Sequence, residues 1–295
     1  MDQTAAIKDW VGRTRKEEDE VSLGAVRRLA ATLDQDPLAF HPGGELPESW
    51  YAILFGPIAR ESALGPDGHP LTGDFLPPLH NTRRMFAGRR VRFHQPLRVG
   101  DRVVRISAVT KAEPKSGRSG PFTLLTVTHE LRAGAGVAIT EEQDIVYRPK
   151  VAAAEADKTA AGSGPRPMRQ AAPDAEKPEW SRPFTPDPVL LFCYSALTFN
   201  AHRIHYDLPY AREQEGYPAL VINGGLTALL LVETARAHLP GAIAGYSARA
   251  MHPLFIGQTI VLNGRRSDEG AELWARDPDG CRAYQVNVVI EKRRP

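Results

Sequence analysis

The sequence predicts an α+β protein made of two related halves, with antiparallel strands in both and one buried helix in the second. The helix lies near residue 230 and has almost no polar face in its first two turns, which is typical of a helix covered on several sides. Paired segments of alternating apolar residues flank short turns in both halves. A Pro-Leu-x-x-Gly segment begins at Pro96 and again at Pro253, 157 positions later. We interpret the two copies as an internal duplication; chance similarity of a common turn is the alternative.

Composition places the chain among globular proteins and excludes several functional classes. Its 295 residues carry 37 Lys and Arg against 35 Asp and Glu, a net charge of +2, so a dedicated nucleic-acid binder is not expected. Two cysteines, Cys193 and Cys281, cannot build a disulfide framework. The N-terminus lacks the pattern of a signal peptide, and the longest apolar stretch, residues 219–235, contains polar residues and is too short to span a bilayer. We therefore expect a cytoplasmic protein with no membrane partner.

The elements follow in order along the first half. Amphipathic spacing predicts helices over residues 4–15 and 20–33. A hairpin is expected after the first Pro-Leu-x-x-Gly copy, with its turn at residues 133–136. Residues 151–182 are rich in Ala, Pro, Gly and charge and cannot bury enough apolar surface to offset ordering entropy. They predict a linker between an N-terminal domain, 1–150, and a C-terminal domain, 183–295.

The second half opens with a short helix, Pro188–Leu197, since Asp187 and Pro188 form a helix-start pattern. The strongest predicted helix is Gly224–His238, with Asn223 as its N-cap and Pro240 at its end. A hairpin is expected around residues 277–280, where Asp, Pro and Gly separate two alternating segments.

The segment between these two helices concentrates polar side chains beside apolar elements. Six of them fall within eight positions: Asn200, His202, Arg203, His205, Tyr206 and Asp207. Such density next to core helices indicates a functional loop. The alternative is a solvated loop whose histidines cap neighbouring backbone groups.

This segment resembles the motif of the MaoC-type hydratases, also called the hydratase 2 family, whose members adopt the hotdog fold. The family pattern is Tyr-x-x-Leu-Ser-Gly-Asp-x-Asn-Pro-x-His, and the chain has Tyr194, Leu197, Asn200 and His205 at matching positions. The sequence Phe-Asn-Ala-His-Arg-Ile-His-Tyr-Asp is similar to a subgroup of double-hotdog enzymes. That subgroup includes mesaconyl-C4-CoA hydratases and mitochondrial-type 3-hydroxyacyl-thioester dehydratases.

The resemblance implies a double hotdog that reversibly hydrates an enoyl-CoA or dehydrates a 3-hydroxyacyl-CoA. It implies no redox cofactor and no metal, an acyl-CoA substrate as partner, and a monomer or homodimer of double hotdogs. In the subgroup the N-terminal hotdog has lost catalysis and makes room for the acyl chain. We therefore expect one site at the interface of the two halves, with its catalytic groups in the C-terminal half. Outside the motif, the other histidines show no metal-ligand spacing: His41, His69, His80, His94, His129, His238 and His252.

Site roles follow from the resemblance and from the chemistry of water addition. His205 aligns with the catalytic histidine and suits a base, because an unperturbed histidine titrates near pH 6.5. Asn200 stands where the family has Asp, and an amide can hold water but cannot take a proton. Gly224 aligns with the residue that holds the thioester oxygen, and a helix start offers free N–H groups. Asp207 is a second candidate for the missing acid.

Further residues are expected to contact substrate. They are Arg203, His202, Tyr206, Asn223 and Gly225. Of these, Asn223 occupies a position where the family has histidine, and Arg203 suits a phosphate of coenzyme A.

Three alternative functions stay open at this point. A 3-hydroxyacyl-acyl-carrier-protein dehydratase would use the same chemistry on another carrier. An acyl-CoA thioesterase on the same fold would also need an acid–base group and a helix-start oxyanion site. The asparagine at position 200 is compatible with a non-catalytic acyl-thioester binding module.

Overall fold

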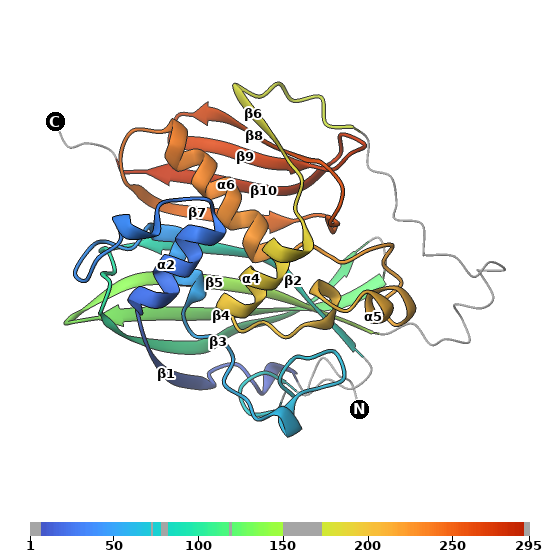
Figure 1. Cartoon of the computed structure of the whole chain (residues 1–295). Helices are drawn as coiled ribbons and strands as arrows, with labels where there is room; N and C mark the ends of the chain where they lie inside the picture. Colours follow the sequence, from blue (N-terminus) through green and yellow to red (C-terminus); the bar gives the residue numbers. More distant parts are fainter. Residues whose placement is uncertain (1–6, 72, 78–81, 118–119, 150–172, 292–295) are drawn as a thin grey trace.

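The computed structural model describes residues 7–71, 73–77, 82–117, 120–149 and 173–291. The strands form one ten-stranded sheet in the order β1-β3-β4-β5-β2-β7-β10-β9-β8-β6, drawn in Figure 1. Its elements are, in chain order, β1 (Thr14–Glu20), α2 (Leu23–Thr32), η1 (Pro37–Ala39), η2 (Glu48–Ile53), η3 (Glu61–Ala63), β2 (Thr82–Phe93), β3 (Arg102–Gly117), β4 (Gly120–Ala133), β5 (Gly136–Pro149), β6 (Trp180–Phe184), α4 (Pro188–Leu197), η4 (Arg203–His205), α5 (Leu208–Glu213), α6 (Gly224–His238), β7 (Ile243–Ala250), β8 (Ile260–Ser267), β9 (Gly270–Arg276) and β10 (Arg282–Ile290).

The two halves contribute five strands each and join along one seam, where β2 pairs antiparallel with β7. Glycines permit the close approach of these two strands. A Cβ on Gly88 would lie 2.7 Å from the Ala248 carbonyl oxygen, and one on Gly245 would lie 2.5 Å from that of Val91. Because the seam is a continuous β-ladder, groups from the two halves lie side by side on the same sheet face.

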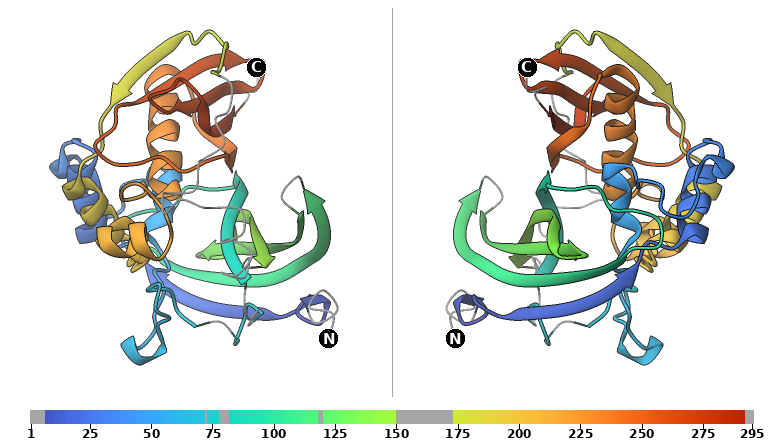
Figure 2. Two further views of the ribbon diagram at one scale, coloured as in Figure 1. Left: turned by 90° about the vertical axis from the view of Figure 1, so that its right-hand side faces the viewer. Right: turned by 90° about the vertical axis from the view of Figure 1, so that its left-hand side faces the viewer.

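Helix α6 lies against one face of the sheet, and α2 and α4 lie side by side farther from the strands (Figure 2). Leu226 and Leu231 of α6 are fully buried, which explains its lack of a polar face. In the first half the corresponding region holds the short 3₁₀ segment η2. Its Trp50 is fully buried and donates from the indole Nε1 to Glu233 of α6 over 3.0 Å.

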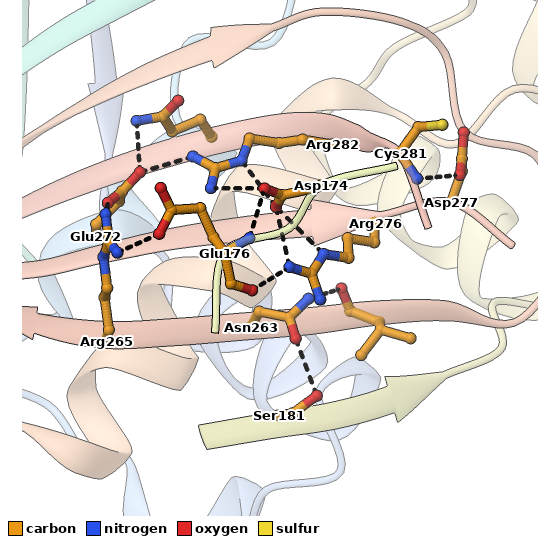
Figure 3. A network of polar contacts seen from close by, with 12 residues as sticks. Asp174, Glu176, Ser181, Asn263, Arg265, Glu272, Arg276, Asp277, Cys281 and Arg282 are labelled. Atoms are coloured by element: carbon orange, nitrogen blue, oxygen red, sulfur yellow. Dashed lines mark hydrogen bonds and ion pairs between the residues drawn. The ribbon is translucent and has the colours of Figure 1, made fainter. Parts of the chain in front are cut away.

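Residues 173–179 pack on the opposite face of the C-terminal strands through an ion-pair network (Figure 3). Asp174 accepts from Arg276 at 3.2 Å and from Arg282 at 3.1 Å, and Glu176 pairs with Arg265. The packing of residues 173–179 differs from the predicted linker over 151–182. Most of that linker lies outside the described residues. Its last part is ordered by charge pairing, and β6 already begins at Trp180.

Apart from the end of the predicted linker, the predicted elements agree with the structure except at the N-terminus. Helices α4 and α6 have the predicted bounds, α2 lies within the predicted helix over 20–33, and both hairpin turns are confirmed. The helix expected over 4–15 lies partly outside the described residues. The prediction is wrong for the last residues of this helix, because β1 begins at Thr14 and pairs with β3 at the edge of the sheet.

Candidate active site

His205 lies in η4 with only 7% of its surface exposed. Its Nδ1 is 2.8 Å from the carbonyl oxygen of Val221, and the Val221 N–H donates to the Ile204 carbonyl over 3.0 Å. A carbonyl only accepts, so Nδ1 carries the proton and Nε2 keeps its lone pair. Burial lowers the pKa of His205 to about 4. The ring is therefore a neutral base, fixed in one tautomer beside the chain segment that leads into α6.

The start of α6 offers a backbone donor three residues after Val221, the residue whose carbonyl holds this base. Asn223 caps the helix, its side-chain oxygen accepting from the Gly225 N–H over 2.8 Å. The Gly224 N–H has no acceptor within the described part of the chain. A Cβ on Gly225 would lie 2.7 Å from the hydroxyl of Tyr194, whereas one on Gly224 would meet Tyr284 at 3.6 Å. The predicted oxyanion donor is thus available, while Asn223 acts as a helix cap.

A second histidine stands next to His205. The rings of His202 and His205 meet edge to face with centroids 5.6 Å apart. On its other side His202 packs on His69, at 4.2 Å between centroids. Burial, followed by the proximity of His69 and His205, lowers the pKa of His202 to about 3. The two histidines of the motif are therefore both neutral near pH 7.

His69 comes from the N-terminal half and is held by Asp67. The His69 Nδ1 lies 3.1 Å from one carboxylate oxygen of Asp67, and the His69 backbone N–H donates to the other over 3.0 Å. Partial burial would raise the pKa of Asp67, but these hydrogen bonds outweigh it and the pKa is lowered. Asp67 is therefore an anion beside the histidine group.

The loop that carries Asp67 packs tightly on the motif of the second half. A Cβ on Gly68, whose φ is +88°, would overlap the Ala201 carbonyl oxygen. The Arg203 N–H donates to the Asp67 carbonyl over 2.9 Å, and its guanidinium donates to the Pro66 carbonyl over 2.9 Å. Residues of the N-terminal half thus pack directly against the motif, in keeping with a site at the interface of the two halves.

Asn200 shapes the loop. It follows Phe199, whose φ is +49°, and its N–H donates to the Ser195 carbonyl over 2.8 Å. Its side-chain oxygen accepts from the His202 N–H over 3.1 Å. Among the described residues no hydrogen bond joins the side chains of Asn200 and His205. The amide therefore acts on the backbone that presents His202.

Three neighbours predicted to act on substrate, or to replace the acid, have structural partners. Arg203 donates to Asp207 from Nη2 over 2.7 Å and from Nε over 3.0 Å. Asp207 also caps α5 by accepting from the Tyr210 N–H over 3.0 Å, so a role as the missing acid is wrong. The Tyr206 hydroxyl donates to the Ala201 carbonyl over 3.0 Å, and 52% of the residue is exposed.

Asp67, His69 and His202 also bring three donor atoms within 4.8 Å of one another. Two of these atoms are already joined by the Asp67–His69 hydrogen bond, which accounts for their proximity. We therefore interpret the group as a hydrogen-bonded pair packed on a second histidine. Asp67 and His69 are not predictable from the motif, because they lie far from it along the chain. The Asp-Gly-His turn that they form is the local signal for them.

The comparisons place this site in a family. The profile of "Hydroxyacyl-thioester dehydratase type 2" matches residues 50–256, more than half of the chain. The chain belongs to the hydroxyacyl-thioester dehydratase type 2 family. The match spans Asp67 and His69 as well as the motif around His205, so the two halves of the site fall within one family region.

Individual relatives cover almost the whole chain. It is 43% identical over 281 residues to a mesaconyl-C(4)-CoA hydratase of Chloroflexus aurantiacus, covering 95% of this chain and 96% of the relative. It is 25% identical over 288 residues to the mitochondrial hydroxyacyl-thioester dehydratase type 2 of Schizosaccharomyces pombe, covering 89% and 90%.

Solved structures confirm the fold predicted from the motif. A Mycobacterium tuberculosis protein described as having a double hotdog fold matches with a TM-score of 0.55 at 15% identity, covering 95% of this chain and 96% of that chain. The predicted α+β double hotdog is confirmed. Within the described residues, no helix combines the length and apolar character needed to cross a membrane.

Proposed function

We propose that this protein reversibly hydrates an enoyl-CoA to a 3-hydroxyacyl-CoA, with a short acyl group of the mesaconyl type as substrate. The family and the 43% identical mesaconyl-C(4)-CoA hydratase support the reaction and the CoA carrier. The observation that carries the proposal is the neutral His205, whose Nε2 keeps its lone pair beside a helix start with a free N–H.

In the hydration direction His205 acts as the base. A water molecule loses one proton to Nε2 while its oxygen forms a bond to the β-carbon of the enoyl group. The electron pair of the double bond moves through the α-carbon onto the thioester oxygen. The Val221 carbonyl, already bonded to the Nδ1 proton at 2.8 Å, stabilises the imidazolium that forms.

The Gly224 N–H stabilises the negative charge on the thioester oxygen. It lies at the positive end of the 15-residue helix α6, and one such oriented donor contributes about 3 kcal/mol in known enzymes. The enolate then takes the proton back from His205 at the α-carbon, which restores the neutral histidine. One water is added and no redox equivalent is consumed.

His202 is proposed to hold the water together with His205. Both rings are neutral, their centroids lie 5.6 Å apart, and a neutral imidazole has one donor and one acceptor nitrogen. The Asp67–His69 pair positions His202 from the N-terminal half.

The test follows two products at once with purified protein. Loss of the conjugated thioester absorbance is recorded with crotonyl-CoA and mesaconyl-C4-CoA while free thiol is titrated. We expect absorbance loss without thiol release, and a drop of ~1000-fold in kcat for His205→Ala. Thiol release would assign a thioesterase. Binding without turnover, unchanged in His205→Ala, would assign a binding module, and turnover confined to acyl-carrier-protein thioesters would change the carrier.

A further inference from the structure

A buried polar group lies at the seam between the two halves. Arg89 of β2 places Nη1 3.4 Å from Glu141 of β5, and their side chains are only 17% and 9% exposed. The Tyr51 hydroxyl donates to Glu141 over 2.9 Å and lies 3.4 Å from that of Tyr246. Taking an arginine and a glutamate out of water costs several kcal/mol for each ion. Close pairing recovers that cost only partly here.

Arg89 is incompletely satisfied by this partner. A guanidinium carries five N–H groups in a planar fork. The contact of Arg89 with Glu141 is long and uses one nitrogen, and the guanidinium also bonds the hydroxyl of Tyr246. Among the described residues, the Arg89 Nε is buried without an acceptor. The hydroxyl of Tyr284 is also buried without a hydrogen-bond partner in the described part of the protein. Unpaired buried donors are costly. One of these two belongs to the Arg89 cation and the other to Tyr284, and together they indicate a site for an acceptor.

The sheet register places these donors on one face. Arg89 stands opposite Ala248 of β7, and Ala248 stands opposite Val286 of β10. Tyr284 is two residues from Val286 and therefore shares its face. Burial raises the pKa of the Tyr284 and Tyr194 hydroxyls, and the positive charge of Arg89 lowers both pKa values.

The same two tyrosines border the start of α6. Tyr284 is the nearest neighbour of a Cβ placed on Gly224, at 3.6 Å, and the Tyr194 hydroxyl is the nearest to one placed on Gly225, at 2.7 Å. An acyl group whose thioester oxygen binds at Gly224 therefore has the Tyr284 ring beside it, and Arg89 stands on the same sheet face two strands away.

We propose that Arg89 and Tyr284 are the residues that recognise the second carboxylate of a mesaconyl-type acyl group, by binding it at the end far from the thioester. This inference rests on the proposed function. A carboxylate accepts from the Arg89 Nε and from the Tyr284 hydroxyl at once, and guanidinium matches its planar geometry. A methyl end of equal size leaves both donors unpaired, and a site built for hydrogen bonds rejects such an analogue strongly. Glu141 holds Arg89 in place when no substrate is bound.

The test compares fumaryl-CoA with crotonyl-CoA, which differ by a carboxylate in place of a methyl group. Wild type is expected to favour fumaryl-CoA in kcat/KM by ~100-fold or more. Arg89→Gln is expected to lower kcat/KM for fumaryl-CoA by ~100-fold while crotonyl-CoA changes little. Arg89→Lys restores part of the loss, since it keeps the charge without the fork.

Two controls separate recognition from folding. Arg90→Gln removes the neighbouring arginine, which points to the other face and pairs with Glu142 and Asp144, and is expected to leave the ratio of the two substrates unchanged. Arg89→Gln combined with Glu141→Gln removes both buried charges and keeps the loss specific to fumaryl-CoA. Equal losses on both substrates overturn the inference alone. Absence of turnover with either thioester in wild type overturns the proposed function and the inference with it.

Discussion

Protonation of His205 sets the acid side of the pH dependence that we expect for this enzyme. Burial lowers the pKa of its imidazole from 6.5 to about 4, which corresponds to roughly 3 kcal/mol against the charged ring in the folded protein. Hydration needs the neutral ring, so kcat/KM stays constant on the acid side of neutrality and falls only below an apparent pKa near 4. With a solvated histidine as base, kcat/KM would already fall near pH 6.5, where such a ring becomes protonated.

The assay is the initial rate of enoyl absorbance loss at low substrate, between about pH 4 and 8, because kcat/KM reports the free enzyme. Circular dichroism at each pH confirms that the protein stays folded. His202→Gln is the matched control. Its profile of kcat/KM against pH is expected to keep an apparent pKa near 4 on the acid side, since the pKa of His202, about 3, lies lower. An acid limb centred near 6.5 in wild type would refute a buried, neutral His205.

The same burial makes the free energy of unfolding depend on pH. The folded-state pKa of His205 lies below the ordinary value of 6.5, so the unfolded chain binds the proton first. Stability therefore falls as pH decreases from about 6.5 towards 4 and is constant above that window with respect to this group. Denaturant titrations of wild type and His205→Gln are expected to differ in this slope.

Further predictions concern the glycine pair, the loop of the first half and metal dependence. Gly225→Ala forces the Tyr194 hydroxyl to move from 2.7 Å and should cost about 1–3 kcal/mol in thermal unfolding; Gly224→Ala should cost less, and equal costs would contradict the packing described. His69→Ala should lower kcat by ~10-fold with little change in KM, because it frees the His202 ring; wild-type kinetics would show that the loop is only structural. Exhaustive dialysis against a chelator should leave kcat unchanged, whereas a loss restored by Zn²⁺ would make Asp67, His69 and His202 ligands.

Local sequence pattern was sufficient for the two long helices of the second half. The bounds of α6 follow from an N-cap and a terminating proline, and its burial from an apolar first turn. The motif places His205 and Gly224 within twenty residues of each other, so both could be named from one stretch of sequence. The Val221 carbonyl that selects the tautomer of His205 was not predictable, because backbone hydrogen bonds across a loop leave no trace in residue type.

The first half shows what such patterns cannot supply. Residues 14–20 are almost entirely charged, which favours a surface helix, yet they form an edge strand, where charged side chains are tolerated. Asp67 and His69 reach the site through the packing of one loop on another, and the spacing of residues far apart does not encode that contact. Nothing in the sequence around Arg89 indicates that its side chain is buried, because the burial results from the pairing of β2 with β7.

The identity of the product tests the central claim most directly. Purified protein is incubated with an enoyl-CoA, and the thioester is analysed by mass spectrometry beside His205→Ala. We predict that the acyl-CoA gains the mass of one water, remains a thioester and is formed only by the enzyme that carries His205. Release of free coenzyme A, or equal conversion by His205→Ala, would contradict the account.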